Sequence, residues 1–335
     1  MKTKTRIIAE IGNTHEGSIG LAKQFIRTAS ECGVDAVKFQ VHLFEAESLP
    51  HAPNPPYFKD ESRKEYFDRT AFSMDQWRAL KSFAEEDCNV DFICSPFSVE
   101  AVQMMQRIAL TTYKIASGEV TNIPMLEAIA KIGNPVLLSS GMSNWEELDL
   151  AVRVLKINGC PHLTILQCTS EYPCMPEHAG LNLLREISSR YDVPVGFSDH
   201  TLGVAVPVAA VCLGATVIEK HFTLSKAMYG PDAAFSVTPE ELRFLVNTIR
   251  DAEKALQHAI DKDAKAQSLG QMKFTFEKSI VAANDLSAGT RLESRHLTCK
   301  KPASGIPSRQ FYDVVGKTLK NDVSANTCIE WEWLE

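Results

Sequence analysis

The sequence predicts a closed (β/α)8 TIM barrel followed by a small, mainly β domain. Short apolar runs alternate with longer amphipathic segments through about the first 260 residues, and eight such strand-then-helix units are typical of a closed barrel. A polar segment follows at 261–273, and residues 274–335 carry short strand-like runs broken by turns. We therefore expect a barrel domain at 1–260, a linker at 261–273 and a second domain at 274–335.

An open, doubly wound sheet is the alternative architecture. The first unit lacks the G-x-G-x-x-G sequence with which such sheets bind dinucleotides, and eight strands fit closure better. Each predicted strand is a short run of β-branched or apolar residues, and the eight runs are Arg6–Gly12, Ala36–Gln40, Asp91–Pro96, Thr112–Ser117, Pro135–Ser140, Leu163–Thr169, Pro194–Ser198 and Thr216–His221.

The segments between these strands carry helix periodicity and end signals. In SIGLAKQFIRTASECG, Leu21, Phe25 and Ile26 share one helical face and Gly33 ends the helix. In NWEELDLAVRVLKING, Asn144 is the expected N-cap and Gly159 follows the last turn.

Two regions depart from this alternation. The segment 41–70 is rich in proline and aromatic residues, and we interpret it as a long functional loop that covers the site at the strand ends. In the small domain we expect strands at Ser279–Ala282, Val314–Val315 and Thr327–Trp331. A domain of about sixty residues is marginally stable alone, so we expect it to pack against a barrel.

Composition restricts the classes of protein that this chain can represent. A net charge of −7 argues against a nucleic-acid surface. No apolar run approaches the roughly 20 residues that span a bilayer, and the N-terminal MKTKTRIIAE is unlike a signal peptide, so we expect a soluble, cytoplasmic protein. The nine cysteines show no C-x-x-C spacing, and we expect reduced core residues, including Cys94, Cys168 and Cys212.

Polar residues recur where the predicted strands end, which is where (β/α)8 barrels carry their active sites. Lys38 and Lys114 lie in apolar runs (AVKFQ, TYKIAS), where a buried cation needs an anion. Hydroxyl groups at the other strand ends could donate hydrogen bonds to phosphate oxygens, and they belong to Ser95, Ser117, Ser139, Ser170 and Ser198. A small phosphorylated acid is the substrate that this set suggests.

His200 and His221 end the seventh and eighth strands, which are neighbours in a closed barrel. Two imidazoles there could hold a divalent transition metal and leave other coordination positions open. No closed tetrahedral ligand pattern is present, so we expect a catalytic ion rather than a structural one.

These strand-end motifs resemble the sialic acid synthase family, whose members condense phosphoenolpyruvate with an N-acetylated hexosamine to give a nonulosonic acid. The motifs that carry the resemblance occur in order along nearly the whole chain: IIAEIGNTHEGS, AVKFQ, CSPFS, YKIASGEVTN, LLSSGMS, QCTSEYP, GFSDHTLG, VIEKHFT and GPDAAFS. The segment FEKSIVAANDLSAGTRLESRHLTCKKPASGIP resembles the antifreeze-like (SAF) domain that follows the barrel in that family.

The resemblance implies a role for each matching residue. It makes His200 and His221 ligands of a divalent ion, most often Mn²⁺, with Mg²⁺ or Co²⁺ as alternatives, and Glu10 the essential carboxylate. It places phosphoenolpyruvate against Lys38, Lys114 and the five serines, and it places the acceptor sugar near Gln40, Glu119, Tyr172, Asp232 and Lys301. It also implies a domain-swapped homodimer.

The sequence departs from the family pattern at two places. The family arginine of an RP motif is replaced in KKP by Lys301, which keeps the charge but loses the planar fork. The family asparagine after the second strand has no clear counterpart, with Asn54 as a candidate. SGE and GPD are closer to the sialic and legionaminic branches than to the pseudaminic one.

Three other functions stay open on the sequence alone. One is a related phosphoenolpyruvate-dependent sugar-acid synthase that acts on a phosphorylated acceptor. Another is a Schiff-base aldolase, although an anion explains both lysines better. The third is a non-catalytic sugar-binding protein, which would leave the metal and phosphate residues unexplained.

Overall fold

The computed structural model describes residues 4–56, 58 and 60–335. The chain forms two compact units, one that ends at His258 and one that begins at Ala259. Each is described by itself below. Among the described residues, no helix is both long and apolar enough to cross a bilayer.

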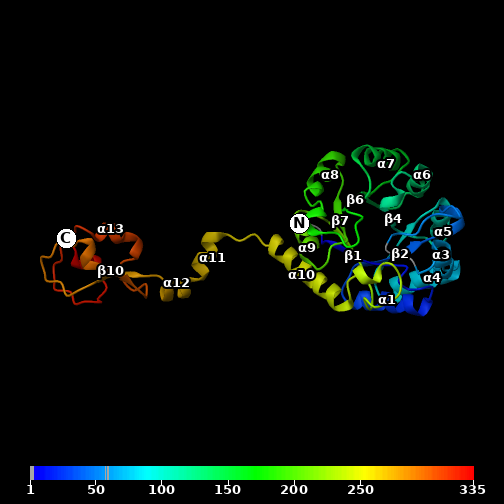
Figure 1. The fold of residues 1–335 in the computed structure, drawn as a ribbon. Coiled ribbons are helices and arrows are strands. Elements are labelled where there is room, and N and C mark those ends of the chain that lie inside the picture. The colour runs from blue at the N-terminus through cyan, green and yellow to red at the C-terminus, as the bar shows by residue number, and fades with distance from the viewer. Residues whose placement is uncertain (1–3, 57, 59) are drawn as a thin grey trace. The chain divides into compact units, whose positions relative to one another are not determined.

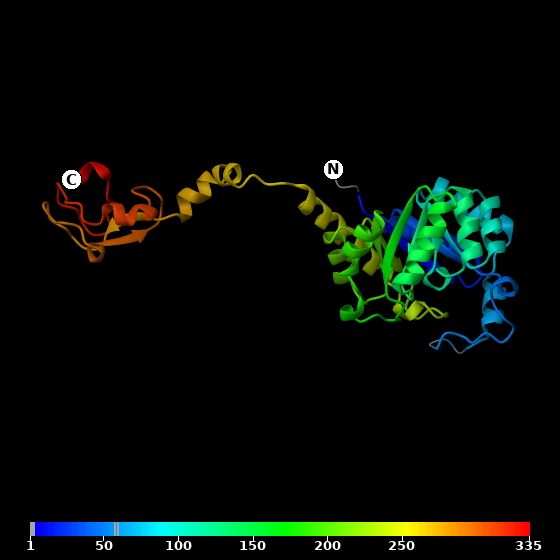
Figure 2. The same ribbon diagram turned by 90° about the horizontal axis from the view of Figure 1, so that it is seen from above.

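The first unit is a closed barrel of eight parallel strands in chain order, which confirms the predicted fold class. Figures 1 and 2 show these strands surrounded by the helices. The strands are β1 (Arg6–Gly12), β2 (Ala36–Val41), β3 (Asp91–Pro96), β4 (Tyr113–Ile115), β5 (Val136–Ser139), β6 (Leu163–Cys168), β7 (Val195–Asp199) and β8 (Val217–His221).

The helices of this unit begin where the sequence provides caps. Ser18 caps α1 through the backbone N–H of Leu21, and Asn144 forms a capping box at the start of α7. The α-helices are α1 (Ile19–Glu31), α2 (Phe44–Glu47), α3 (Arg63–Thr70), α4 (Met74–Ser82), α5 (Val99–Arg107), α6 (Ile123–Ile132), α7 (Trp145–Ile157), α8 (Leu183–Tyr191), α9 (Ala205–Cys212) and α10 (Pro239–Gln257).

The segment 41–70 is not the irregular loop that the sequence suggested. It contains α2 and α3. A capping box begins α3: the Ser62 hydroxyl accepts from the backbone N–H of Glu65, and the Glu65 carboxylate accepts from the backbone N–H of Ser62. Each helix is only one or two turns long, which is too short for a clear helical periodicity, and a proline-rich stretch separates the two. The sequence therefore did not predict them.

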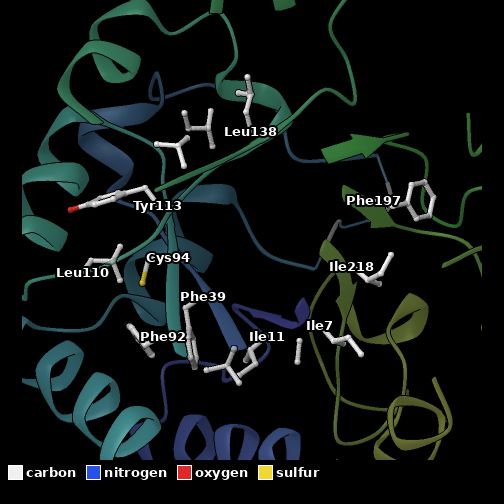
Figure 3. Packing of buried hydrophobic residues seen from close by; sticks show 14 of the residues in the cluster. Ile7, Ile11, Phe39, Phe92, Cys94, Leu110, Tyr113, Leu138, Phe197 and Ile218 are labelled. Carbon is white, nitrogen blue, oxygen red and sulfur yellow. The ribbon is translucent and has the colours of Figure 1, made fainter. Parts of the chain in front are cut away.

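The two faces of the barrel strands have different environments. The outward side chains pack against the helices in one apolar core, and Figure 3 shows Phe39 and Phe92 directed from their strands toward the helices. The inward side chains begin with an apolar layer made of Ile8, Ala36, Ile93, Leu137, Leu166 and Val217. Two residues further along the same strands, the inward positions become polar: Glu10, Lys38, Ser95, Ser139, Cys168 and Glu219.

The second unit has its own apolar core, centred on Ile280, Leu292 and Ile329. Its two-stranded antiparallel sheet pairs β9 (Ser279–Ala282) with β10 (Leu297–Lys300), so the first predicted strand is confirmed and β10 was missed.

The other two strand predictions in this unit are wrong. Val314 ends a short helix, α13 (Phe311–Val314), and 327–331 makes only a single bridge, between Cys328 and Val281, before a 3-10 turn starts at Trp331. Residues 327–329 hydrogen-bond to β9, but this pairing is too short to form a strand.

The predicted linker contains regular structure. Helices α11 (Lys262–Ser268) and α12 (Gly270–Phe276) occupy most of it. The two helices bury none of their residues. α11 is polar, whereas α12 exposes Met272, Phe274 and Phe276.

All nine cysteines are free thiols, and they lie within the described residues. Cys94 and Cys168 are buried as expected, whereas Cys212 is exposed at the end of α9. The expectation that Cys212 is a core residue is therefore wrong, because the apolar run of α9 has a solvent-facing side.

Candidate active site

A cavity of about 600 Å³ lies at the carboxyl ends of the barrel strands. This volume is in the range of small-molecule sites. The cavity is lined by most of the residues that the sequence singled out: Glu10, Lys38, Gln40, Asn54, Lys114, Ser117, Glu119, Ser139, Ser170, Tyr172, Ser198, His200, His221 and Asp232. Ser95 and Lys301 are the two predicted site residues outside this lining.

Two lysines and two glutamates form a charged cluster at the floor of the cavity. Lys38 Nζ lies 2.9 Å from Glu10 Oε2 and 3.6 Å from Glu219 Oε1. Lys114 Nζ lies 3.3 Å from the same Glu219 oxygen. The register of the barrel produces this arrangement, because Glu10 pairs with Lys38 between β1 and β2, and β8 adjoins β1 on the other side.

The pKa values of these groups show how the charges depend on one another. Burial by itself would lower the pKa of Lys38, but the carboxylates of Glu10 and Glu219 outweigh it, so this pKa is raised. Burial lowers the pKa of Lys114, which Glu219 offsets only in part. Burial raises the pKa of Glu10, whereas the two lysines hold the pKa of Glu219 well below its ordinary value.

This cluster changes the sequence argument about the lysines. We expected both to require a substrate anion, yet Glu219 already neutralises part of their charge. Lys38 also donates to Ser95 Oγ over 3.1 Å, so Ser95, which is fully buried, holds the ammonium group. Among the described residues Glu219 is the only ion-pair partner of Lys114, which leaves donors of Lys114 for a substrate.

Hydroxyl groups surround the cavity next to Lys114. The backbone N–H of Gly141 donates to Ser117 Oγ over 3.2 Å. A Cβ at Gly141 would lie 2.5 Å from Ser170 Oγ and 2.6 Å from Ser117 Oγ, so only glycine leaves this space open. Ser139 Oγ is buried and has no hydrogen-bond partner among the described residues. These groups form a polar cradle whose hydroxyls could donate to anionic oxygens.

Ser198 has a different partner. Its hydroxyl donates to Glu219 Oε1 over 3.0 Å, so it helps to hold this carboxylate between the two lysines. The hydroxyl therefore reaches a substrate only if it turns away from Glu219.

The two histidines at the ends of β7 and β8 are close together. Their ring centroids are 5.4 Å apart, and the Tyr172 ring packs 4.2 Å from that of His200. His200 Nδ1 donates to the carbonyl oxygen of Thr169 over 2.8 Å, which directs the Nε2 lone pair away from the backbone.

The histidine pair fits an open divalent-metal site. Burial lowers the pKa of His221 to about 4, so this ring is neutral, as a metal ligand must be. For His200, burial lowers the pKa, but the contacts with Cys168 and with the backbone of Thr169 outweigh it, so this pKa is raised. The described residues contain no cluster of three or more histidine, cysteine, aspartate or glutamate side chains that could hold an ion. The protein would thus supply two ligands.

Another wall of the cavity comes from the segment 41–70 and the loop after β8. Asn54, Arg63 and Tyr66 line the cavity from the segment, and Asp232 lines it from the loop. The amide of Asn54 donates to the carbonyl oxygen of Glu61, so this candidate is tied to its own segment.

Arg69 joins this wall to the rest of the barrel. Its guanidinium lies 2.6 Å from Glu16 Oε2 in the loop after β1 and 2.5 Å from Glu61 Oε1. It also lies over the rings of Tyr66 and Tyr229. Three loops that surround the cavity are thereby held by one cation.

Sequence reasoning missed other residues of the cavity, and among them Glu219, Cys168 and His42 bear most directly on its chemistry. For Glu219 a signal was present, because it lies two residues before His221 on the same strand and so faces the same side. Cys168 ends β6 two residues before Ser170, but was read as core. His42 follows β2 at the start of the segment 41–70.

Lys301 lies in the second compact unit. Its ammonium group is 4.8 Å from the centroid of the Phe276 ring, and the peptide bond to Pro302 is cis.

A closed (β/α)8 barrel whose strand ends bring buried lysines, carboxylates and two histidines into one cavity is the arrangement of a barrel enzyme. Residues 25–261 match the NeuB family and residues 277–335 match the SAF domain. The chain belongs to the NeuB family, which confirms the resemblance to sialic acid synthases.

Three similar proteins cover nearly the whole chain or its larger part. The N,N'-diacetyllegionaminic acid synthase of Campylobacter jejuni is 38% identical over 323 residues, 94% of this chain and 95% of that protein. The N-acetylneuraminate-9-phosphate synthase of Mus musculus is 36% identical over 336 residues, 98% of this chain and 92% of that protein. The crystal structure of N-acetylneuraminic acid (sialic acid) synthetase from Leptospira borgpetersenii in complex with citrate has a TM-score of 0.70 and 31% identity, covering 81% of this chain and 92% of that one.

Proposed function

We propose that this protein is a nonulosonic acid synthase, a transferase that condenses phosphoenolpyruvate with an N-acetylated hexosamine to give a sialic acid-type product and phosphate. The observation that carries this proposal is the convergence of Lys38, Lys114, a ring of hydroxyls and a histidine pair in one cavity. The synthase names of the relatives support it. N-acetylmannosamine and the 2,4-diacetamido-6-deoxy hexoses are the candidate acceptors.

Phosphoenolpyruvate would bind beside Lys114. The ammonium group has unused donors, and the cradle of Gly141, Ser117 and Ser170 lies close to it on adjoining strand ends. Hydroxyl donors stabilise phosphate oxygens without adding charge to a site that already contains two lysines. The unpartnered hydroxyl of Ser139 would gain a hydrogen bond in the complex.

His200 and His221 would hold a divalent ion, for which Mn²⁺ is our first choice and Mg²⁺ or Co²⁺ are alternatives. Such an ion supplies Lewis-acid polarisation of the acceptor's aldehyde oxygen.

The bonds change as follows in the proposed reaction. C3 of phosphoenolpyruvate forms a bond to the aldehyde carbon of the open-chain acceptor, whose oxygen takes a proton, and C2 becomes electron-poor. Water adds to C2 and loses a proton. The tetrahedral intermediate then collapses with cleavage of its bond from C2 to the phosphate oxygen, which releases phosphate and leaves a 2-keto acid.

Glu10 is the residue that we assign to the chemistry at C2. Its buried carboxylate would stabilise positive charge there and accept the proton of the attacking water. Burial raises the pKa of Glu10, which makes the carboxylate a stronger base than a solvated glutamate.

A phosphorylated acceptor is the second candidate, as in other phosphoenolpyruvate-dependent sugar-acid synthases. Arg63 favours it, because this cation lines the cavity and its buried Nε has no hydrogen-bond partner among the described residues. An acceptor phosphate would supply the missing partner. The name of the mouse relative also contains a phosphorylated product.

We further propose that the active form is a homodimer in which Lys301 of each subunit completes the partner's site. A chain with Glu10→Gln and a chain with Lys301→Ala should each be weakly active alone. Mixed dimers should regain activity, because one barrel then combines an intact Glu10 with an intact Lys301. Mixed dimers that stay inactive would refute exchange between subunits.

One assay tests the proposed function. Phosphate release from phosphoenolpyruvate should be measured with N-acetylmannosamine, its 6-phosphate and 2,4-diacetamido-6-deoxy hexoses, each with Mn²⁺. We expect release with at least one sugar and none without sugar. Absence of release with every sugar and metal would refute the proposal. Borohydride trapping with pyruvate serves as the control for a Schiff-base aldolase.

A further inference from the structure

A buried histidine lies between two aromatic rings beside the cavity. The His42 ring stacks on Phe67 of α3 at a centroid distance of 3.9 Å and on Phe97 after β3 at 4.0 Å, with interplanar angles of 7° and 20°. Its side chain is 9% exposed and that of its neighbour Glu47 is 8% exposed. The ring therefore has one orientation, and its two nitrogens face fixed partners.

The hydrogen bonds of His42 belong to a chain of four side chains. His42 Nδ1 lies 2.8 Å from Glu47 Oε1, and His42 Nε2 lies 3.1 Å from Gln40 Oε1. Gln40 Nε2 then donates to Glu10 Oε1 over 2.8 Å. The chain thus runs from helix α2 to the carboxylate that we assign to the chemistry.

With Glu10 and Glu47 both ionised, the donors and acceptors of this chain allow one consistent proton arrangement. The amide of Gln40 must turn its NH2 toward Glu10, because the reverse orientation would place its oxygen against a carboxylate. Gln40 Oε1 then faces His42 and can only accept, so Nε2 of His42 donates. A carboxylate of Glu47 also only accepts, so Nδ1 donates as well, and a ring with two N–H donors carries a positive charge.

The surroundings favour this charge. Glu47 Oε1 is its counter-ion, while Glu47 Oε2 accepts the backbone N–H of Leu43 over 3.2 Å and is thereby held in place. The two flanking aromatic faces attract a cation. At the other end of the chain, Glu10 Oε1 accepts from Gln40, and Glu10 Oε2 forms an ion pair with Lys38 Nζ at 2.9 Å.

We propose that the ion pair of His42 and Glu47 is a positioning device, in which His42 fixes the amide of Gln40 and, through it, the carboxylate of Glu10. This inference rests on the proposed function for the role of Glu10, whereas the charge of His42 follows from the contacts with Glu10 and Glu47 ionised. His42 touches no reacting atom. Its loss should therefore impair turnover without impairing the binding of phosphoenolpyruvate near Lys114.

Nitrogen-15 NMR of histidine-labelled full-length protein tests the charge directly. The His42 signals are assigned by their loss in His42→Phe, which keeps an aromatic ring in the stack. At pH 7.5 both ring nitrogens of His42 should be protonated in the wild type, and one should lose its proton in Glu47→Gln. A neutral His42 ring in the wild type would overturn the proposal.

The coupling between the His42–Glu47 pair and Gln40 can be tested by NMR without measuring enzyme activity. The side-chain NH2 signals of Gln40, assigned by their loss in Gln40→Ala, should shift in Glu47→Gln. They should stay unchanged in His51→Phe, a matched control at an exposed position of the same segment. Unshifted Gln40 signals in Glu47→Gln would refute the coupling.

Kinetics test the positioning role. We expect kcat to fall at least about tenfold in His42→Phe and in Glu47→Gln, with the Kd for phosphoenolpyruvate unchanged and with wild-type values in His51→Phe. Unchanged kcat in both variants would refute positioning. If His42→Phe does not fold, the kcat of Glu47→Gln alone tests the positioning role. If the wild type itself is inactive on every sugar, the proposed function fails, and the two NMR readouts still decide whether the charged chain exists.

Discussion

Lys220 Nζ lies 2.5 Å from Asp199 Oδ2, and the two side chains are 1% and 0% exposed. Each residue is the sequence neighbour of a proposed metal ligand, since Asp199 precedes His200 and Lys220 precedes His221. The two residues pair in the β7–β8 register, and Lys220 also donates to the carbonyl oxygen of Thr201. This ion pair therefore joins the two strand ends that hold the histidines in position.

Removing one partner should leave an unpaired buried charge. We expect Lys220→Met to lower the free energy of unfolding by about 3–5 kcal/mol in urea titrations. The matched control is Lys226→Met, because the Lys226–Glu241 pair is 44% and 43% exposed and should contribute less than about 1 kcal/mol. If both substitutions lower the free energy of unfolding equally, the buried ion pair contributes no more to stability than an exposed one.

Metal binding should depend on both histidines. We expect the wild type to bind Mn²⁺, observed by electron paramagnetic resonance, and to lose activity with a chelator until Mn²⁺ is restored. His200→Ala and His221→Ala should fold but bind Mn²⁺ at least about tenfold more weakly. The exposed His162→Ala serves as the control. Wild-type Mn²⁺ affinity in both His200→Ala and His221→Ala would show that these residues are not the metal ligands.

Lys114 should bind phosphoenolpyruvate more directly than Lys38. A hydrogen bond to a charged group contributes roughly 1.5–3 kcal/mol, so Lys114→Ala should weaken the Kd for phosphoenolpyruvate at least about tenfold and that of the sugar much less. Calorimetric titration measures both constants. Lys131→Ala, at an exposed pair on α6, is the control. An unchanged Kd would refute the placement of phosphoenolpyruvate beside Lys114.

The space beside Gly141 gives a steric test of the same placement. A methyl group there would lie 2.5 Å from Ser170 Oγ and 2.6 Å from Ser117 Oγ. Gly141→Ala should therefore raise the Kd for phosphoenolpyruvate by about tenfold or more while the fold persists. Gly270→Ala introduces the same methyl where no atom lies within 4 Å, and it should change nothing. Tight binding in Gly141→Ala would show that the cradle is not used.

Glu10→Gln isolates the carboxylate. The amide keeps the shape of Glu10 but removes its charge, so we expect both substrates to bind while kcat falls by at least about a hundredfold. Single-turnover measurements of phosphate release separate this chemical step from binding. Near wild-type kcat would exclude Glu10 from the reaction.

The fold and much of the site could be predicted from local sequence patterns. Short runs of apolar and β-branched residues marked the strands, and their polar end positions fall at one end of a parallel barrel. Glu10, Lys38, Lys114, His200 and His221 were therefore recognisable before any contact was known. These signals are local, because apolar runs and helix caps involve residues only a few positions apart.

Contacts across the barrel depended on closure and register. Glu219 lies between Lys38 and Lys114, although it is 105 positions from Lys114 in the chain. Its carboxylate neutralises part of the positive charge of the two lysines, for which the sequence analysis expected only a substrate anion. His42 meets Phe67, Phe97 and Glu47 only because α2, α3 and the loop after β3 converge on it. Such partners come from segments with no shared periodicity, so their pairing is determined by packing in three dimensions.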